Sequence, residues 1–283
     1  MPVFLSWLDD PDCLLEGEQP EERWQTEYLD KLNVSDKKQR AFWIAQYREL
    51  GEEIYQEYPS TAEEAFLATR QGTYYARLYM AHVQHLGREV NDLWDPNLPV
   101  HVAMDLGMND DFVLGFFQLW RNTSGQLEYR VIDEYRNSGE GLAHYVNVVA
   151  NKEYTIGTVI LPHDVKVREL TTGMSRLAKL RELGLRNYKV LPRLPILDGI
   201  EAVRQIIPMM WIDRKCVYIK ACLLNYTKDW DDKLAVWKDK PLHNEYSHGA
   251  DMLRMMAMSN LGGQAIESNK GRTNVIVTNG LCI

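Results

Sequence analysis

The alternation of apolar and polar residues changes in character at about Leu98. From there, short apolar runs are separated by residues that favour turns, and the segment NTSGQ between the second and third runs is typical of a turn. Three consecutive strands with short connections predict an antiparallel meander. The three runs are PVHVAMDLG (99–107), DFVLGFFQLW (111–120) and LEYRVIDEYR (127–136).

Downstream of the meander, the pattern predicts helices that alternate with strands. The predicted strands are GTVILP (157–162) and YKVLP (188–192), and the predicted helices are GEGLAHYVNVVANKEY (139–154), TGMSRLAKLRELG (172–184), DGIEAVRQIIP (198–208), KCVYIKACLLNYT (215–227) and a final helix around residues 250–258. This order predicts an α/β fold, an RNase H-like mixed β-sheet with helices on both faces.

The segment before this sheet is predicted to be mainly helical. Residues 35–50, SDKKQRAFWIAQYREL, place apolar side chains at near-helical spacing behind a candidate N-cap, Ser35. Further on, in YPSTAEEAF, Pro59 ends one helix, and Thr61 with Glu64 forms the pattern of a capping box for the next. The expected corner between these helices needs no functional explanation.

Composition limits the class of protein more than it identifies it. The chain has 283 residues, of which 45% are hydrophobic and 25% charged, as in ordinary soluble globular proteins. The four cysteines have no CxxC spacing, and neither a disulfide framework nor a zinc ribbon is indicated. No apolar run reaches the length of a membrane span, and the first residues lack a basic region. We therefore expect an intracellular protein without a membrane partner.

The net charge of −8 argues against a protein that coats nucleic acid. It does not exclude an enzyme that meets DNA through one local basic face. It is also compatible with an acidic metal site.

Candidate chemistry comes from three aspartates. Asp105 ends the first predicted strand, and Asp164, 59 residues later, ends the fourth. In a sheet where these strands are neighbours, the two carboxylates meet and repel each other unless a cation lies between them, and Mg²⁺ or Mn²⁺ prefers such oxygen ligands. Asp251, on the final helix, adds a third carboxylate. Three acids at one sheet edge suit two-metal hydrolysis of a phosphodiester.

Each aspartate also has a simpler explanation. The Asp-x-Gly at Asp105 is common turn chemistry, Asp164 could cap the next segment, and a lone Asp on a helix such as Asp251 is usually solvated. Their joint placement at neighbouring strand ends favours the metal site. Asp133 and Glu134, at the end of the third strand, are competing candidates for the second acid.

Five segments, in this order and at these separations, resemble the large terminase subunit of tailed bacteriophages, specifically its C-terminal nuclease half. They are QEYPSTAEEAF, AMDLG, VILPHD, LDGIEAVRQIIP and KPLHNEYSHGADMLRMM, and the match extends from about Trp43 to about Met258. The resemblance implies residues 1–80 as a helical linker and remnant of the ATPase half, 81–262 as the RNase H-like nuclease domain and 263–283 as a polar C-terminal tail.

The resemblance also implies an activity, its metal ions and its partners. It implies an endonuclease that cuts concatemeric viral double-stranded DNA during genome packaging, with two Mg²⁺ or Mn²⁺ ions held by Asp105, Asp164 and Asp251. The implied partners are double-stranded DNA, the terminase ATPase domain, the small terminase subunit and the portal protein. The implied location is the cytoplasm of a bacterial host cell.

The chain departs from the family pattern in two respects. No G-x-x-x-x-G-K-[ST] occurs, so the chain has no ATPase P-loop, and we expect a fragment, a split gene product or a degraded prophage copy. Asn244 stands where relatives tend to carry Asp, and Met252 where they tend to carry Ala. Asn244 brings no negative charge, which is expected to lower metal affinity or activity.

Further residues surround the predicted site. His248 shares a helical face with Asp251 and could orient a metal-bound water or shuttle a proton, although a histidine that packs at the helix start is an equal alternative. Asp111 and Asn244 are candidates for supporting the metal ligands. His163, next to Asp164, is predicted to point to the other face of the strand and to be structural.

A basic stretch follows Asp164 and provides the candidate DNA contacts. The segment from Asp164 to Lys189 is the densest in Lys and Arg, and a solvated helix face balanced by Glu169 and Glu182 is the alternative. The DNA-binding candidates within it are Lys166, Arg168, Arg176 and Lys179.

Two other functions compete with the terminase nuclease. Another RNase H-like nuclease, of the Holliday-junction resolvase type, would share the carboxylates but not need the YPSTAEEAF segment. A catalytically weak module that docks the packaging motor would suit the acidic charge and Asn244.

Overall fold

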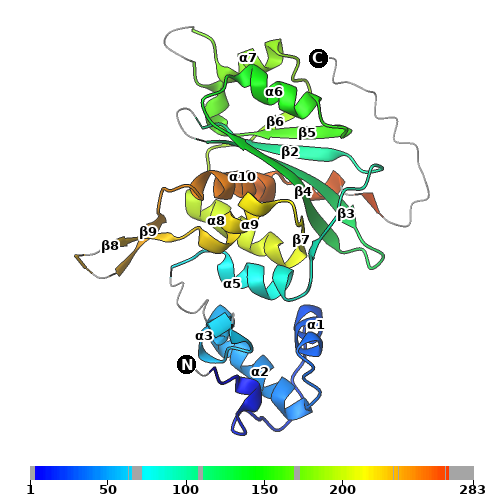
Figure 1. Ribbon diagram of the computed structural model, residues 1–283, viewed down its shortest axis with the longest axis vertical. Helices are drawn as coiled ribbons and strands as arrows, with labels where there is room; N and C mark the ends of the chain where they lie inside the picture. Colours follow the sequence, from blue (N-terminus) through cyan, green and yellow to red (C-terminus); the bar gives the residue numbers. More distant parts are fainter. Residues whose placement is uncertain are drawn as a thin grey trace. The chain divides into compact units, whose positions relative to one another are not determined.

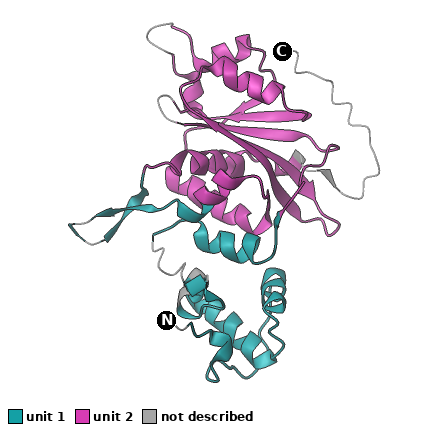
Figure 2. Cartoon of the chain, in the orientation of Figure 1, with its two compact units in different colours: residues 1–89, 223–242 teal, residues 90–222, 243–283 magenta. Residues whose placement is uncertain are grey.

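The computed structural model describes residues 4–62, 64–65, 72–107, 111–168, 173–231, 233–234, 236–264 and 266–267. The chain divides into two compact units (Figure 2). The first comprises residues 1–89 and 223–242, and the second comprises residues 90–222 and 243–283. Within the described ranges, none of the helices has both the length and the apolar character needed to span a membrane.

The first unit is mainly helical, as the sequence predicts. Its helices are α1 (Arg23–Lys31), α2 (Lys37–Leu50), α3 (Ile54–Glu57) and α5 (Ala76–Tyr79), and a π-helical turn follows at Met80–Gln84. Its core is aromatic, because Tyr28 of α1 packs against Trp43 of α2 with ring centroids 5.0 Å apart. The hairpin of β8 (Lys228–Asp231) and β9 (Val236–Pro241) also belongs to this unit, although it lies within residues 81–262, which the resemblance assigns to the nuclease domain.

Half of the predicted capping box at YPSTAEEAF is present. The Glu64 backbone N–H donates to the Thr61 hydroxyl at 3.2 Å. The Glu64 carboxylate does not return to Thr61, however, and accepts instead from the Ser60 N–H at 2.5 Å and the Tyr28 hydroxyl at 2.7 Å. It therefore ties this corner to α1. Phe66, at the end of the motif, lies outside the described residues.

A mixed sheet forms the centre of the second unit (Figure 1). The predicted meander is β2 (Val100–Asp105), β3 (Phe112–Arg121) and β4 (Leu127–Asn137), and both of its pairings are antiparallel. The remaining strands are β1 (Glu89–Val90), β5 (Ile156–Leu161), β6 (Tyr188–Val190), β7 (Met210–Asp213) and β10 (Ile266–Glu267).

The strand order is β1-β7-β4-β3-β2-β5-β6, and β10 pairs with β3. The antiparallel strands β2, β3 and β4 are extended by β5, which pairs in parallel with β2, and by β6, which pairs in parallel with β5. This arrangement is the RNase H-like plan that the sequence predicts. This order places the end of β2 next to the end of β5.

Helices cover both faces of the sheet (Figure 1). One face carries α6 (Leu142–Ala150) and α7 (Arg176–Glu182). The other carries α8 (Ile196–Ile206), α9 (Val217–Asn225) and α10 (Ser247–Met258). This layering confirms the predicted fold class.

The register of β2 assigns its side chains to the two faces. Val102 and Met104 belong to the buried cluster that includes Tyr145 of α6. Since successive side chains of a strand alternate between faces, Asp105 points to the opposite face, where α10 contacts β2.

Close approach of α10 to the sheet depends on a missing side chain. A Cβ atom at Gly115 of β3 would lie 2.2 Å from the Met252 sulfur, so any larger residue there would force either the Met252 side chain or α10 to move. Gly199 of α8 plays a similar part, because its Cβ would lie 3.0 Å from Arg254 Cδ. These contacts set the position of the helix that carries Asp251 and His248.

The sequence pattern did not predict β7 or the β8–β9 hairpin. β7 is only four residues long, MWID, and follows Pro208 directly after a helix, so no alternation is available to identify it. The hairpin contains four lysines and four aspartates among its strand and turn residues, and therefore resembles a loop in composition.

Candidate metal centre

Asp105, Asp164 and Asp251 line one open cleft of about 710 Å³ in the second unit. Asp105 is the last residue of β2, Asp164 lies in the turn after β5, and Asp251 lies on α10. Three segments that are far apart in the sequence therefore bring carboxylates to the same cleft. The three aspartates that the sequence predicts as metal ligands therefore line the same cleft.

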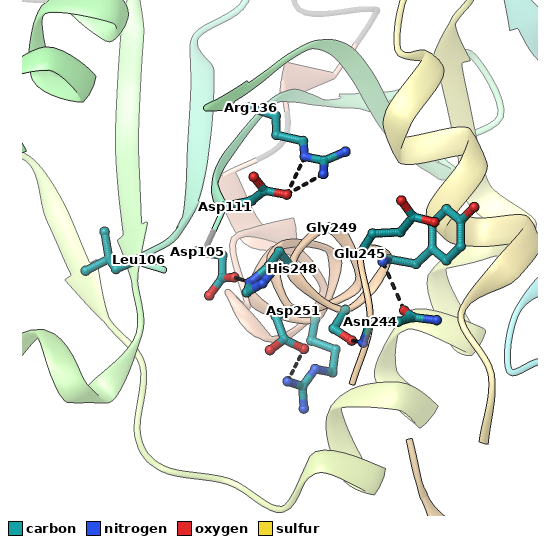
Figure 3. Close-up of polar contacts among 12 residues, drawn as sticks. Asp105, Leu106, Asp111, Arg136, Asn244, Glu245, His248, Gly249 and Asp251 are labelled. Carbon is teal, nitrogen blue, oxygen red and sulfur yellow. Dashed lines mark hydrogen bonds and ion pairs between the residues drawn. The ribbon is translucent and has the colours of Figure 1, made fainter. Parts of the chain in front are cut away.

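The Asp105 carboxylate lies deepest in the site, and its side chain is 17% exposed. His248 Nδ1 lies 3.0 Å from its Oδ2 atom, as Figure 3 shows. Burial raises the pKa of Asp105 to about 6, because desolvation disfavours the charged form; the His248 contact opposes this shift, and the charge of Asp251 adds to it. A cation in the cleft would relieve the cost of keeping this carboxylate ionised.

Asp251 projects from α10 one helical turn after His248, so the two side chains lie on the same helical face. Its carboxylate pairs with Arg254 of the same helix. Burial raises its pKa, and the Arg254 guanidinium lowers it in opposition. Arg254 thus provides a positive charge at the place where the sequence predicts a metal ion.

The position of Asp164 differs from the sequence prediction. β5 ends at Leu161, and Asp164 lies beyond it in a 3₁₀ turn, His163–Lys166, that begins after Pro162. Strand alternation therefore does not apply to His163, and the prediction that it points to the other face of the strand is wrong. His163 is exposed in this turn and lines the same cleft.

The two oxygens of Asp164 have different surroundings. Its Oδ1 atom is buried and has no hydrogen-bond partner among the described residues, whereas Oδ2 lies 3.9 Å from Arg176 Nη1. Arg176 also donates to the Leu106 carbonyl at 3.2 Å. A buried carboxylate oxygen without a donor is unfavourable unless a ligand satisfies it.

These donors fit a hard divalent cation in chemistry but do not form a closed cluster in this structure. Among the described residues, no group of three or more His, Cys, Asp or Glu side chains lies close enough to hold a metal ion. Two of the three acids are instead paired with arginines. The unpartnered Asp164 oxygen and the raised pKa of Asp105 are the observations that favour a cation here.

Asp111 and Asn244 are engaged in other contacts (Figure 3). Asp111 accepts from Arg136 Nε at 2.6 Å, and the Arg136 guanidinium lies 4.4 Å from the centre of the Tyr218 ring. The Asn244 side-chain oxygen accepts from the Tyr246 N–H at 3.0 Å. Asn244 therefore shapes the turn that leads into α10.

The competing acids, Asp133 and Glu134, have structural partners. Asp133 Oδ2 accepts from Lys152 at 2.6 Å and from the Tyr154 hydroxyl at 2.8 Å. The Glu134 carboxylate accepts two backbone N–H bonds at the start of α9, at 2.8 and 2.7 Å. Carboxylates that cap a helix or pair with a lysine need no metal, and neither residue lines the cleft.

The four DNA-binding candidates fall into two groups. Lys166 and Arg168 are exposed beside Asp164. Arg176 has only 13% of its side chain exposed and is directed toward Asp164, and Lys179 pairs with Glu182 at 2.9 Å. Lys166 and Arg168 are therefore better placed for a phosphate than the other two.

The sequence reasoning missed Arg254 and the role of Arg176 inside the site. The spacing of Asp251 and Arg254, three residues apart on a predicted helix, is typical of an ion pair and could have identified Arg254. No sequence pattern connects Arg176 with Leu106, because the contact depends on tertiary packing.

A comparison with protein-family models and with curated proteins finds no match. A comparison with solved structures finds large terminases and their nuclease domains. The large terminase of a thermophilic bacteriophage has 20% identity and a TM-score of 0.44, and the match covers 62% of this chain and 42% of that one. This chain therefore corresponds to less than half of that phage protein.

Two nuclease domains are similar to the chain to the same degree. The nuclease domain of the P22 large terminase has 15% identity and a TM-score of 0.44, with 60% of this chain and 85% of that one covered. The g2p nuclease domain from bacteriophage SPP1, solved with bound Mn, has 15% identity and a TM-score of 0.41, with 56% and 84% covered. The roles of individual residues rest on the geometry of the cleft and not on similarity at this level.

Proposed function

We propose that this chain is a metal-dependent endonuclease that cleaves concatemeric viral double-stranded DNA during genome packaging, as the nuclease part of a large terminase subunit. The observation that carries the proposal is the gathering of Asp105, Asp164 and Asp251 in one cleft from three separate elements of an RNase H-like sheet. Independent turn, cap or surface roles would not bring the three together.

The residues of the cleft have distinct parts in this proposal. Asp105, Asp164 and Asp251 would hold Mg²⁺ or Mn²⁺, and two such ions would supply an activated water and stabilise the leaving oxygen of the phosphodiester. His248 orients the Asp105 carboxylate through their 3.0 Å contact. Arg254 and Arg176 pair with Asp251 and Asp164, and a guanidinium at either place would also suit a phosphate.

The proposed setting follows from the same function. Double-stranded DNA is the substrate, and an ATPase domain on a separate segment or chain delivers it. A small terminase subunit and a portal protein are the further proposed partners, and the proposed location is the cytoplasm of a bacterial host.

The test is cleavage of supercoiled plasmid DNA in the presence of Mn²⁺. We expect Asp105→Asn, Asp164→Asn and Asp251→Asn each to abolish nicking while the far-ultraviolet circular dichroism spectrum stays unchanged. Asp198→Asn is the matched control, since Asp198 is exposed in the first turn of α8 and does not line the cleft. Full nicking by the Asp251→Asn protein would show that Asp251 is not a metal ligand.

The same preparation separates the competing functions. Preferential cutting of a four-way DNA junction over linear duplex would indicate a resolvase-type nuclease. The pairing of two cleft acids with arginines favours the second competitor, a catalytically weak docking module. Plasmid that stays intact with Mn²⁺, together with binding to a portal ring, would establish that competitor in place of the nuclease.

A further inference from the structure

One rim of the cleft exposes apolar side chains beside an acidic site. The segment Pro192–Ile196, here called the cleft lip, runs from the connection after β6 to the first residue of α8, and all five of its residues line the cleft. Leu194 is 46% exposed and Ile196 is 47% exposed. Two exposed apolar side chains on one segment that lines a polar cleft are candidates for contact with a bound partner.

The cleft lip is anchored at both ends, so its exposed side chains are held in place. Leu191, just before it, is buried and donates its N–H to the Leu161 carbonyl at 2.9 Å. At the other end, the Pro195 carbonyl accepts from the Gly199 N–H at 3.3 Å. Pro192 and Pro195 also fix their own backbone φ angles. A stiff segment loses little freedom when it binds.

The charge around the cleft lip favours a polyanion as the occupant. Arg193 is exposed, and its side chain makes no hydrogen bond or ion pair with the other described residues. Lys166 and Arg168 are exposed two and four residues after Asp164, which lines the cleft, and they add positive charge to that segment. An apolar protein surface would not pair with these positive charges, whereas a phosphate backbone would neutralise them.

The burial of Asp105 limits how closely the phosphates of a regular duplex can approach the acids of the cleft. Asp105 has only 17% of its side chain exposed, at the inner end of the cleft. A regular duplex presents its phosphates on a smooth, stiff outer surface, so bending or unstacking it at the cut site would let one phosphate enter further. Proteins commonly obtain such bends by inserting an apolar side chain from the minor groove between two base pairs.

We propose that the cleft lip enters the minor groove of duplex DNA beside the scissile phosphate, with Leu194 as an apolar wedge at a base step and Arg193 as a contact to the adjoining phosphate. The inference rests on the proposed nuclease function and adds how the substrate is held. Leu194 and Arg193 are positioning residues, because neither touches the reacting atoms.

The first experiment reads DNA distortion without cleavage. Duplexes that carry 2-aminopurine at successive positions are titrated with the wild-type protein in Ca²⁺, which takes oxygen ligands and prevents turnover from obscuring the reading. We expect the fluorescence of one base step to rise on binding to the wild type and to stay at the free-duplex level with Leu194→Ser. Leu197→Ser is the matched control, since Leu197 is 49% exposed on the adjoining helix but does not line the cleft.

The second experiment compares affinity and rate. Leu194→Ser is expected to lower the Mn²⁺-dependent nicking rate about tenfold while the Kd for duplex changes by less than about threefold. Arg193→Gln is expected to weaken binding to every sequence and to reduce the slope of log K against log salt by about 1, as the loss of one phosphate contact requires. Arg204→Gln removes the same charge from α8 away from the cleft and should leave that slope unchanged.

The outcomes are separable from those of the proposed function. If the wild type nicks plasmid DNA but Leu194→Ser and Leu197→Ser behave alike in fluorescence and rate, the wedge is wrong and the nuclease stands. If Leu194→Ser leaves every DNA measurement unchanged but abolishes binding to a portal ring, the lip is a protein-docking surface. If the wild type neither binds nor cuts duplex, both proposals fail.

Discussion

At the scale of single residues, the central feature is a carboxylate kept in an unfavourable environment. Asp105 is largely buried beside His248 and within the field of Asp251. Such a group binds a proton more readily than a free aspartate does, and it also gains more from a cation. The pH dependence of metal binding is therefore a direct measure of the role of Asp105.

We expect Mn²⁺ affinity to be nearly constant well above pH 6 and to fall below it. The pKa of Asp105 in the metal-free protein is raised to about 6, so a proton competes with the metal below that pH, and the affinity falls by up to about tenfold per pH unit when one proton is displaced. Isothermal titration calorimetry between pH 5 and 8 measures this. Affinity that does not change over this range would mean that Asp105 is not a ligand.

The stability of the metal-free protein should change in the opposite direction. Because the folded pKa of Asp105 lies above its ordinary value, the folded protein binds more protons than the unfolded chain between those two values. The ionised Asp105 carboxylate therefore destabilises the metal-free fold above pH 6, and the free energy of unfolding rises as the pH falls from above 6 toward 4.

Asn244 gives a second prediction at this scale. Its side-chain oxygen already accepts from the Tyr246 N–H, and an aspartate there would accept equally well. Contrary to the expectation from the family pattern, we expect Asn244→Asp to leave the far-ultraviolet circular dichroism spectrum unchanged and the nicking rate within about twofold of the wild type, because Asp and Asn form the same Asx-turn. A rise in Mn²⁺ affinity would instead show that residue 244 reaches the metal ions.

At the scale of elements, the position of α10 decides the geometry of the site, because it carries both His248 and Asp251. The helix approaches β3 over Gly115. We expect Gly115→Ala to lower the free energy of unfolding by about 1–3 kcal/mol, because the added methyl overpacks the contact with Met252. Gly263→Ala is the control, since its Cβ would meet no atom within 4 Å.

Chemical denaturation of both variants measures this effect. An unchanged midpoint for Gly115→Ala would mean that the Met252 side chain moves aside without cost.

The start of α9 provides another test between elements. Glu134 accepts the N–H groups of Tyr218 and Ile219, which otherwise have no partner in the first turn of the helix. Glu134→Ala is expected to lower the free energy of unfolding by about 1–2 kcal/mol, as the loss of a helix cap does, with Mn²⁺ affinity unchanged. Weaker Mn²⁺ binding by the Glu134→Ala protein would indicate that Glu134 is a metal ligand.

At the scale of the whole molecule, binding of a metal should be coupled to folding of the second unit. The three acids come from distant parts of the chain, so the unfolded chain cannot present them together. At a free Mn²⁺ concentration of 100 times Kd, we expect the folded state to gain about 2.7 kcal/mol. Thermal unfolding with and without EDTA measures the gain.

This gain should disappear in the Asp105→Asn protein and persist in Asp198→Asn. Equal stabilisation of all three proteins would mean that Mn²⁺ binds elsewhere.

The sequence by itself determined the meander and most of the helices and strands after it, but not β7 or the β8–β9 hairpin. Alternation predicted β2, β3 and β4, and it placed Asp105 at a strand end and Asp251 on a helix. These predictions succeed because the period of buried side chains is a local property of the chain.

Only the tertiary structure decided the surroundings of these residues. The capping role of Glu134 and the contact of Arg176 with the Leu106 carbonyl depend on segments distant in sequence. The 3₁₀ turn that holds Asp164 beyond β5 is closed by local hydrogen bonds, which no pattern of apolar residues marks. The stiff, exposed lip beside the acids is likewise visible only once the β6–α8 connection is placed at the cleft. Burial and pairing arise from packing between elements, which no local pattern encodes.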